Sequence, residues 1–273
     1  MGPTPPRVLT IAGTDSGGGA GAAADLRTMA ACGVHGCVAV TAVTVQNSLG
    51  VTGVHAVPPE TVAAQIESVA GDIGLDAVKT GMLASTAIIE AVVGACDRSG
   101  IGGRVPLVVD PVAASMHGDP LLAGDALDAY RDLLFPRATL ITPNLDEVRL
   151  LVGVDVRDRD GQYEAATALH ALGPRFVLVK GGHMAGDDGC VDLLHDGTTF
   201  TELPGPRFDT GHTHGGGDSM ASAIASGLAR GLAVPDAVAF GKRYIVEAVR
   251  HSYPLGAGHG PVSPFWAIPP WWE

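Results

Sequence analysis

The sequence predicts an α/β fold in which a mostly parallel central sheet lies between two layers of helices, a three-layer αβα sandwich. Short runs rich in β-branched residues alternate with longer Ala-rich segments of helical period, which is typical of repeated βα units. Several of the short runs are apolar throughout, as expected of strands covered on both faces. The chain has 273 residues, 46% of them hydrophobic, without a linker or internal repeat, so we expect a single domain over residues 1–273.

In chain order, the apolar β-branched runs predict the strands, and the Ala-rich periodic segments between them predict the helices. We expect strands at residues 8–12, 37–43, 77–80, 107–110, 139–142 and 176–180. We expect helices at residues 20–31, 59–73, 86–98, 121–134, 145–152 and 161–172. The pair Asp196-Gly197 is typical of tight hairpin turns, so the runs on either side of it, residues 191–195 and 199–203, predict a hairpin. Two helices, at residues 218–230 and 235–251, close the fold.

Charge and composition exclude several classes of function. Asp and Glu outnumber Lys and Arg by 29 to 17, a formal net charge of −12, which disfavours binding to nucleic acid or anionic lipid. Residues 28–59 contain no charged residue except His, but polar residues and glycines interrupt every stretch long enough to span a membrane. The four cysteines form no CxxC pair and the N-terminus lacks the order of a signal peptide. We therefore expect a cytoplasmic protein that binds neither nucleic acid nor membrane.

A glycine-rich turn, residues 13–21, follows the first predicted strand, where ligands gather in open α/β sheets. Gly17, Gly19 and Ala22 formally match the dinucleotide fingerprint, which also needs a carboxylate about twenty residues further on to hold a ribose. The first carboxylate after Asp25 is Glu60, so the pattern argues against nicotinamide chemistry. Two interpretations remain: a tight strand-to-helix turn, or a backbone that approaches a small ligand, and we favour the second.

A second glycine cluster, His214-Gly215-Gly216-Gly217-Asp218, directly precedes an Ala/Ser-rich helix. Successive glycines at the start of a helix let several N–H groups converge on an anion, so Gly215, Gly216 and Gly217 predict a phosphate cradle. The Asp218 carboxylate could take the proton from an attacking hydroxyl beside the incoming phosphoryl group. The alternative for Asp218 is that it only caps the helix.

Oxygen ligands follow two neighbouring predicted strands. Asp110 ends one strand, and Asn144 and Glu147 follow the next, which suits a hydrated Mg²⁺ that bridges phosphates. The alternative is that Asn144 is an N-cap and Glu147 its capping-box partner. The lysines are few, so each could mark a place near phosphate where Arg cannot replace Lys. Lys180 ends a predicted strand. Lys242 lies in the last predicted helix, and for it the alternative to a nucleotide contact is an ordinary solvated position.

Taken together, these motifs resemble the ribokinase-like superfamily, and within it the hydroxymethylpyrimidine/phosphomethylpyrimidine kinases of thiamine biosynthesis. The resemblance covers nearly the whole chain and rests on several stretches in the same order: residues 10–21 (TIAGTDSGGGAG), 41–47 (TAVTVQN), 79–82 (KTGM), 109–112 (VDPV), 142–147 (TPNLDE), 179–183 (VKGGH) and 213–215 (THG).

The resemblance implies a ribokinase-like fold and transfer of the γ-phosphoryl group of ATP to 4-amino-5-hydroxymethyl-2-methylpyrimidine, and then to its monophosphate. It implies that Asp25 and Gln46 contact the aminopyrimidine and that Gly13 and Met82 line its pocket. It also implies ATP and Mg²⁺ as cofactors, with the metal and triphosphate held by the strand-end oxygen ligands, the two lysines near the nucleotide, and a homodimer. The residues implied for the metal and nucleotide are Asp110, Glu147, Asn144, Lys180 and Lys242.

The chain departs from the family pattern at two places. Many members carry Cys where this chain has Asp218, and the sugar-kinase branch carries Asp; Ala22-Ala23 stands where the family often has Ile-Gln. Three rival functions remain open: a pyridoxal kinase on the same fold, a ligand-binding module without activity, and nicotinamide-dependent redox chemistry.

Overall fold

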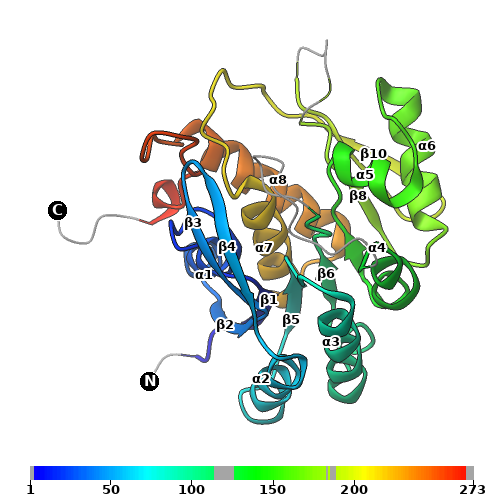
Figure 1. The fold of residues 1–273 in the computed structure, drawn as a ribbon. Coiled ribbons are helices and arrows are strands. Elements are labelled where there is room, and N and C mark those ends of the chain that lie inside the picture. Colours follow the sequence, from blue (N-terminus) through cyan, green and yellow to red (C-terminus); the bar gives the residue numbers. More distant parts are fainter. Residues whose placement is uncertain (1–2, 114–125, 183, 185–188, 269–273) are drawn as a thin grey trace.

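The structure, a computed structural model, describes residues 3–113, 126–182, 184 and 189–268. Its centre is an eight-stranded sheet in the order β10-β9-β8-β7-β6-β5-β1-β2, which is parallel from β8 to β2 (Figure 1). The last two strands, β9 and β10, add to the sheet as an antiparallel hairpin. The strands are β1 (Arg7–Ala12), β2 (His35–Val40), β5 (Ala77–Thr80), β6 (Leu107–Val109), β7 (Leu140–Ile141), β8 (Val177–Val179), β9 (Asp192–His195) and β10 (Phe200–Leu203).

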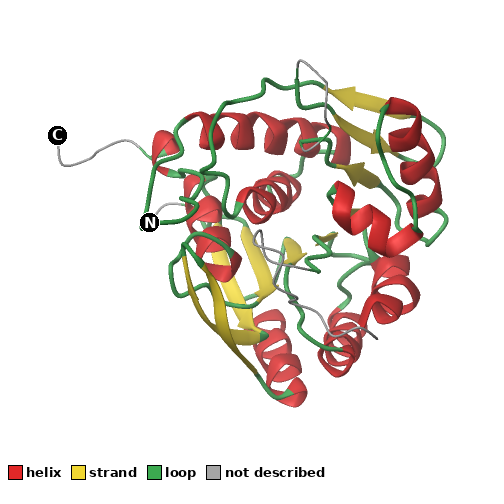
Figure 2. Ribbon diagram, turned by 45° about the horizontal axis from the view of Figure 1, so that its top comes forward, coloured by secondary structure: helices red, strands yellow, loops and turns green. Residues whose placement is uncertain are grey.

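Helices cover both faces of this sheet, which confirms the predicted three-layer architecture (Figure 2). The first layer contains α1 (Gly21–Ala31), α7 (Gly216–Ala229) and α8 (Val234–Arg250). The second contains α2 (Pro59–Asp72), α3 (Thr86–Ser99), α4 (Ala126–Ala129), α5 (Leu145–Val152) and α6 (Arg159–His170). Side chains alternate between the two faces along each strand, so Leu9 and Ile11 pack under the second layer and Val8 under the first.

The predicted single strand at residues 37–43 is wrong. The sheet strand β2 ends at Val40, and a separate strand β3 (Ala42–Asn47) begins there and pairs antiparallel with β4 (Gly50–Ala56). Thr41 stands at the break, because its N–H still donates to Ala12 at the end of β1 whereas its carbonyl accepts from the N–H of Val57, which follows β4. Its hydroxyl donates to the carbonyl of Met82. The β4 strand was missed because its glycines and the turn Ser48-Leu49 lack the usual hairpin signals.

The remaining elements lie within about two residues of their predicted ranges. In the helix predicted at residues 121–134, residues 121–125 lie outside the described residues; α4 is followed by a π-helical turn (Tyr130–Leu134) and a short 3-10 turn (Phe135–Arg137). A last 3-10 turn spans Phe265–Ala267. Among the described residues, no helix is both long enough and apolar enough to cross a membrane.

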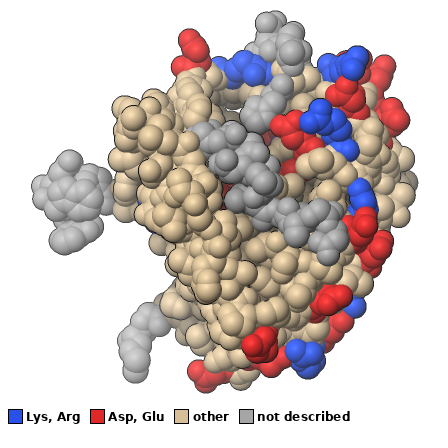
Figure 3. Space-filling model, in the orientation of Figure 1, with Lys and Arg blue, Asp and Glu red and all other residues tan. Residues whose placement is uncertain are grey.

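The β3–β4 hairpin stands beside the main sheet as a two-stranded sheet of its own. In Figure 3 the surface over this hairpin shows only uncharged side chains, whereas charged side chains gather on the side that carries α3 to α6. Several apolar side chains of the hairpin are exposed: Val43, Val45, Leu49 and Val54.

Candidate active site at the carboxyl edge of the sheet

The chemistry-bearing loops lie together because the parallel strands β1, β5, β6, β7 and β8 all end at the same edge of the sheet. Residues that follow these strand ends include Gly13, Gly81, Asp110, Asn144 and Lys180. Helix α7 begins at the same edge. A Cβ added to Gly81, after β5, would lie 3.5 Å from Oδ1 of Asp218, and one added to Gly217 of α7 would lie 3.2 Å from Nζ of Lys180.

The second glycine cluster forms the beginning of α7. Gly215 is the N-cap residue with φ of 72°, and it has no side chain that could cap the helix. The N–H of Gly216 donates to the carbonyl of Thr213 at 3.1 Å, so the prediction that all three glycine amides face an anion needs correction. The next N–H groups, those of Gly217 and Asp218, belong to the first turn and lack an intrahelical acceptor. These two amides, at the positive end of the helix dipole, are the candidate anion site.

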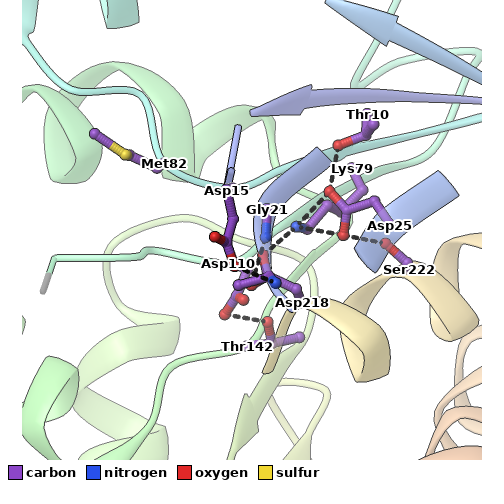
Figure 4. A network of polar contacts seen from close by, with 12 residues as sticks. Thr10, Asp15, Gly21, Asp25, Lys79, Met82, Asp110, Thr142, Asp218 and Ser222 are labelled. Carbon is purple, nitrogen blue, oxygen red and sulfur yellow. Dashed lines mark hydrogen bonds and ion pairs between the residues drawn. The ribbon is translucent and has the colours of Figure 1, made fainter. Parts of the chain in front are cut away.

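Asp218 does not cap the helix. Its Oδ1 accepts from the ammonium of Lys79 at 2.9 Å and its Oδ2 accepts from the N–H of Gly21 at 3.2 Å (Figure 4). Burial raises the pKa of Asp218, but the Lys79 ammonium more than offsets burial, so the pKa lies below its usual value. With 15% of its side chain exposed, Asp218 is an ionised carboxylate that reaches the open side of the site.

Asp25 does not lie in a substrate pocket. Its side chain is fully buried, and its oxygens accept from the hydroxyls of Thr10 and Ser222 and from the ammonium of Lys79. The predicted contact between Asp25 and the aminopyrimidine is therefore corrected: its oxygens already bind protein donors. Burial raises the pKa of Asp25 to about 6 against the attraction of Lys79, which leaves the carboxyl ionised at neutral pH.

Lys79 lies at the centre of the site, although the resemblance to the family implied no role for it. Burial lowers its pKa, but the charges of Asp218 and Asp25 more than compensate, so the pKa is raised and the ammonium stays charged. The signal for it was present, because Lys79 is one of only three lysines of the chain and lies in a short, fully buried strand. No sequence pattern shows which carboxylates face such a lysine.

The first glycine-rich turn binds its own aspartate instead of a ligand. The carboxylate of Asp15 accepts from the N–H groups of Gly17, Gly19 and Ala20 at 2.8 to 2.9 Å. It also lies 2.9 Å from Nε2 of His214, the residue that precedes the α7 cradle. The interpretation that this backbone approaches a small ligand is wrong for these amides, because the Asp15 side chain occupies them. The turn therefore attaches the end of β1 to the beginning of the cradle.

Replacing Asp15 by Asn is expected to lower the free energy of unfolding by about 1–3 kcal/mol at pH 7, because charge-assisted bonds to three amides and His214 weaken. Burial raises the pKa of Asp15, but the hydrogen bond from His214 and those from the backbone outweigh it, so the pKa lies below its usual value of 3.8. A lowered carboxyl pKa adds stability above the unfolded pKa and loses it as the pH falls through the folded pKa.

Urea unfolding of Asp15→Asn and of the unaltered protein at a series of pH values checks this expectation. The difference in stability should be full at pH 7 and should shrink as the pH falls below 3.8. Asp209→Asn, which alters an exposed carboxylate of the loop before His212, is the control. A difference that stays constant down to pH values below 3.8 would contradict the proposed role of the Asp15 charge.

The predicted substrate-pocket residues other than Asp25 lie around the same edge. A Cβ placed on Gly13 would lie 3.1 Å from Sδ of Met82, so these two residues are adjacent, as expected. Nε2 of Gln46, on β3, lies 3.5 Å from Nε2 of His214. Gln46 thus extends from the hairpin toward the residue that begins the cradle.

Asp110 and Lys180 form an ion pair at the floor of the cradle. The ammonium of Lys180 donates to Oδ1 of Asp110 at 2.9 Å, and Thr142 donates to the same oxygen at 3.1 Å. A Cβ placed on Gly217 would lie 3.2 Å from Nζ of Lys180 and 3.4 Å from Oδ2 of Asp110. Because Gly217 has no side chain, Lys180 and Asp110 can lie directly against the beginning of α7.

Asn144 and Glu147 form the capping box of α5. The side chain of Asn144 accepts from the N–H of Glu147 at 2.9 Å, and Glu147 Oε2 accepts from the N–H of Asn144 at 2.7 Å. Burial raises the pKa of Glu147 to about 8, more than the nearby Lys180 lowers it. The protein alone supplies too little positive charge to offset the burial of this carboxyl, so a bound cation beside it would stabilise its ionised form. Among the described residues, no three His, Cys, Asp or Glu side chains form a ready metal cage.

The contacts of Lys242 are with residues outside the cradle. Its ammonium donates to the carbonyl of Cys190 at 2.9 Å and to Oδ2 of Asp192 at 2.8 Å. The side chain joins α8 to β9, and it is buried, so the solvated alternative is wrong. The structure brings the other predicted catalytic, nucleotide and metal residues to the sheet edge, but it gives Lys242 a structural ion pair.

The chain is similar to known proteins in both sequence and fold. Residues 15–263 match the family model described as phosphomethylpyrimidine kinase. The chain is 61% identical, over 98% of its length and 96% of the relative's, to a hydroxymethylpyrimidine/phosphomethylpyrimidine kinase of Mycobacterium tuberculosis. A crystal structure of phosphomethylpyrimidine kinase from Clostridium difficile superposes with a TM-score of 0.78 at 37% identity, covering 89% of this chain and 99% of that one. The pyridoxal kinase of Staphylococcus aureus in complex with AMP-PCP and pyridoxal superposes with a TM-score of 0.85 at 32% identity, covering 96% and 93%.

Proposed function

The chain belongs to the phosphomethylpyrimidine kinase family, and we propose that it transfers the γ-phosphoryl group of ATP to 4-amino-5-hydroxymethyl-2-methylpyrimidine and then to the resulting monophosphate. The observation that carries this proposal is the position of Asp218, whose carboxylate stands in the first turn of α7, paired with Lys79 and beside the amides of the candidate anion site. A base and an anion site at one helix terminus are what transfer of a phosphoryl group to an alcohol requires.

In the proposed mechanism Asp218 accepts the hydrogen bond of the substrate hydroxyl and orients its oxygen toward the γ-phosphorus. Asp218 takes the hydroxyl proton as the new P–O bond forms and the bond from the γ-phosphorus to the β–γ bridging oxygen breaks, which releases ADP. The amides of Gly217 and Asp218 donate to the oxygens of the transferring group, where negative charge is spread in the transition state. The pair formed by Lys180 and Asp110 lies under the same cradle, with the ammonium placed to neutralise phosphate charge.

Mg²⁺ fits the carboxylates on this edge, because it binds through one or two carboxylates, keeps several waters and takes its remaining ligands from phosphates. Asp110 and Glu147 are the residues that would hold it, with Asn144 close by. The ion would supply positive charge that offsets the negative charge of the ATP phosphates. The raised pKa of Glu147 supports this assignment, since a cation beside the carboxyl would favour its ionised form.

Replacing Gln46 by Ala is expected to raise KM for the pyrimidine by about 10-fold or more while KM for ATP changes by less than about threefold. The side-chain amide has both donors and an acceptor, which can complete the hydrogen bonds of an aminopyrimidine ring, and it lies beside His214. Steady-state kinetics with each substrate varied in turn measure both constants. Equal losses for the two substrates would instead indicate that the site is misfolded.

Pyridoxal kinase activity is the second candidate, and the superposition on the Staphylococcus aureus enzyme is what favours it. The experiment that separates the two compares kcat/KM for the hydroxymethylpyrimidine and for pyridoxal under saturating ATP. We expect the pyrimidine to be preferred by about 100-fold or more, with diphosphate as the final product. A preference for pyridoxal would overturn the proposal.

We also propose that residues 1–273 act as one unit, in the cytoplasm, and as a homodimer. The exposed valines of the β3–β4 hairpin are an uncharged surface that two copies could cover together. Light scattering after size-exclusion chromatography, on the unaltered protein and on Val45→Lys, tests the proposed homodimer. A monomer for the unaltered protein would contradict it.

A further inference from the structure

A buried row of charges extends inward from Asp218. Lys79 lies between Asp218 of α7 and Asp25 of α1, with its ammonium 2.9 Å from an oxygen of each carboxylate (Figure 4). The side chains of Lys79 and Asp25 have no exposed surface, whereas 15% of the Asp218 side chain is exposed. Only Asp218 can meet a substrate, so any effect of Lys79 or Asp25 on the reaction must pass through Asp218.

The inner end of the row is held by donors from three elements. Thr10 of β1 donates to Oδ2 of Asp25 at 2.6 Å, Ser222 of α7 donates to Oδ1 at 2.7 Å, and Lys79 donates to both oxygens. Thr10 and Lys79 are direct partners in the register of β1 and β5, so their side chains leave the same face of the sheet side by side. The position of Asp25 is therefore determined, and with it the position of the ammonium.

The outer end of the row depends on this anchor. One oxygen of Asp218 accepts from Lys79 and the other from the N–H of Gly21, so the carboxylate is held from β5 and from the beginning of α1. The three protons of the ammonium are used by two oxygens of Asp25 and one of Asp218. Lys79 therefore has no donor left for a direct hydrogen bond to a substrate phosphate.

We propose that Lys79 is a positioning residue for phosphoryl transfer: anchored by Asp25, it fixes the Asp218 carboxylate in the orientation that accepts the substrate hydroxyl. The proposal rests on the function proposed above for Asp218. Because Asp25 remains as the counter-ion of Lys79, Asp218 can be neutralised by the substrate proton without leaving the buried ammonium unpaired. Asp25 thus supports the reaction from inside the protein instead of contacting the pyrimidine.

A double-mutant cycle between Lys79→Met and Asp218→Asn tests the proposal. Lys79→Met alone should lower kcat by about 10- to 100-fold, because a displaced reacting group costs rate. KM for the pyrimidine and for ATP should change by less than about threefold. In the Asp218→Asn background, Lys79→Met should change kcat by less than about threefold, because the group it positions is already absent. Losses that multiply in the double variant would overturn the proposal, because they would mean that Lys79 acts independently of Asp218.

A second cycle guards against misfolding, since Lys79→Met leaves two carboxylates buried without their cation. Asp25→Asn removes one charge and leaves Lys79 paired with Asp218, so the folded state stays balanced. It should lower kcat by about 10-fold in the unaltered background and by less than about threefold beside Asp218→Asn. An unchanged kcat in Asp25→Asn, with native circular dichroism, would overturn the role given to the anchor.

Ser226→Ala is the matched control, because Ser226 is another fully buried hydroxyl of α7 that donates to the carbonyl of Ser222 outside the charge row. Its kcat should equal that of the unaltered protein. The single variant Asp218→Asn separates this proposal from the function on which it rests. If Asp218→Asn keeps kcat, the role of Asp218 as base fails; if it loses kcat and both cycles are additive, only the positioning role fails.

Discussion

Replacing Asp218 by Asn is expected to lower kcat by about 10²- to 10⁴-fold, the contribution of a positioned general base, with KM for ATP changed by less than about threefold. Asn has the same shape, and its one carbonyl oxygen can still accept from either Lys79 or Gly21, so one of the two contacts of the side chain is kept. It cannot take the proton of the substrate hydroxyl. The loss should therefore fall on the chemical step and not on binding.

Single-turnover kinetics with excess enzyme measure that step directly. Asp160→Asn is the control, because Asp160 also lies in the first turn of a helix, α6, but on the exposed surface. The same exchange there should leave the rate unchanged. A rate for Asp218→Asn within about threefold of the unaltered protein would mean that phosphoryl transfer here needs no base at this position.

Replacing Gly215 by Ala is expected to lower the free energy of unfolding by about 3 kcal/mol or more, as the sum of left-handed backbone strain and overpacking. Gly215 has φ of 72°, and an added Cβ would lie 1.9 Å from the carbonyl oxygen of Gly19. The new methyl group meets backbone and cannot move aside as a flexible side chain could. The cradle and the first glycine-rich turn must then separate, which should lower kcat/KM by about 100-fold.

Gly231→Ala provides the matched control for this variant. Gly231 also has a positive φ, 86°, but a Cβ there would meet nothing within 4 Å. The Gly231→Ala variant should lose only about 1–2 kcal/mol of folding stability, because the only cost is backbone strain, and it should keep full activity. Urea unfolding and steady-state kinetics on both variants separate the two contributions. Equal stability losses for Gly215→Ala and Gly231→Ala would show that the contact with Gly19 is not tight.

The fold was predictable because its signals are local. Apolar β-branched runs between Ala-rich segments suffice to predict β5, whose range matches the prediction residue by residue, and the hairpin turn at Asp196-Gly197. Ligand residues at the carboxyl ends of parallel strands follow from topology alone, so Asp110 and Lys180 could be expected together. The β3–β4 hairpin was not predictable, because the break at Thr41 depends on contacts with Val57 and Met82 that are distant in sequence.

The errors at the site have the same cause. A glycine-rich turn looks the same in sequence whether its amides bind a phosphate or the side chain of Asp15, because the difference lies in the orientation of one carboxylate. Asp25 looks like a ligand residue until Thr10, Lys79 and Ser222 are placed around it, and these come from three separate elements. Lys242 was placed near the nucleotide by the scarcity of lysines and by resemblance, neither of which shows that packing pairs it with Asp192.

A crystal structure with Mg²⁺, AMP-PCP and the hydroxymethylpyrimidine tests the central claim most directly, through the distance from the substrate hydroxyl to Asp218. The account predicts that the hydroxyl oxygen lies about 2.6–3.2 Å from a carboxylate oxygen of Asp218. It also predicts that the γ-phosphate accepts from the N–H groups of Gly217 and Asp218. A hydroxyl bound elsewhere, with the γ-phosphate away from the start of α7, would contradict the account.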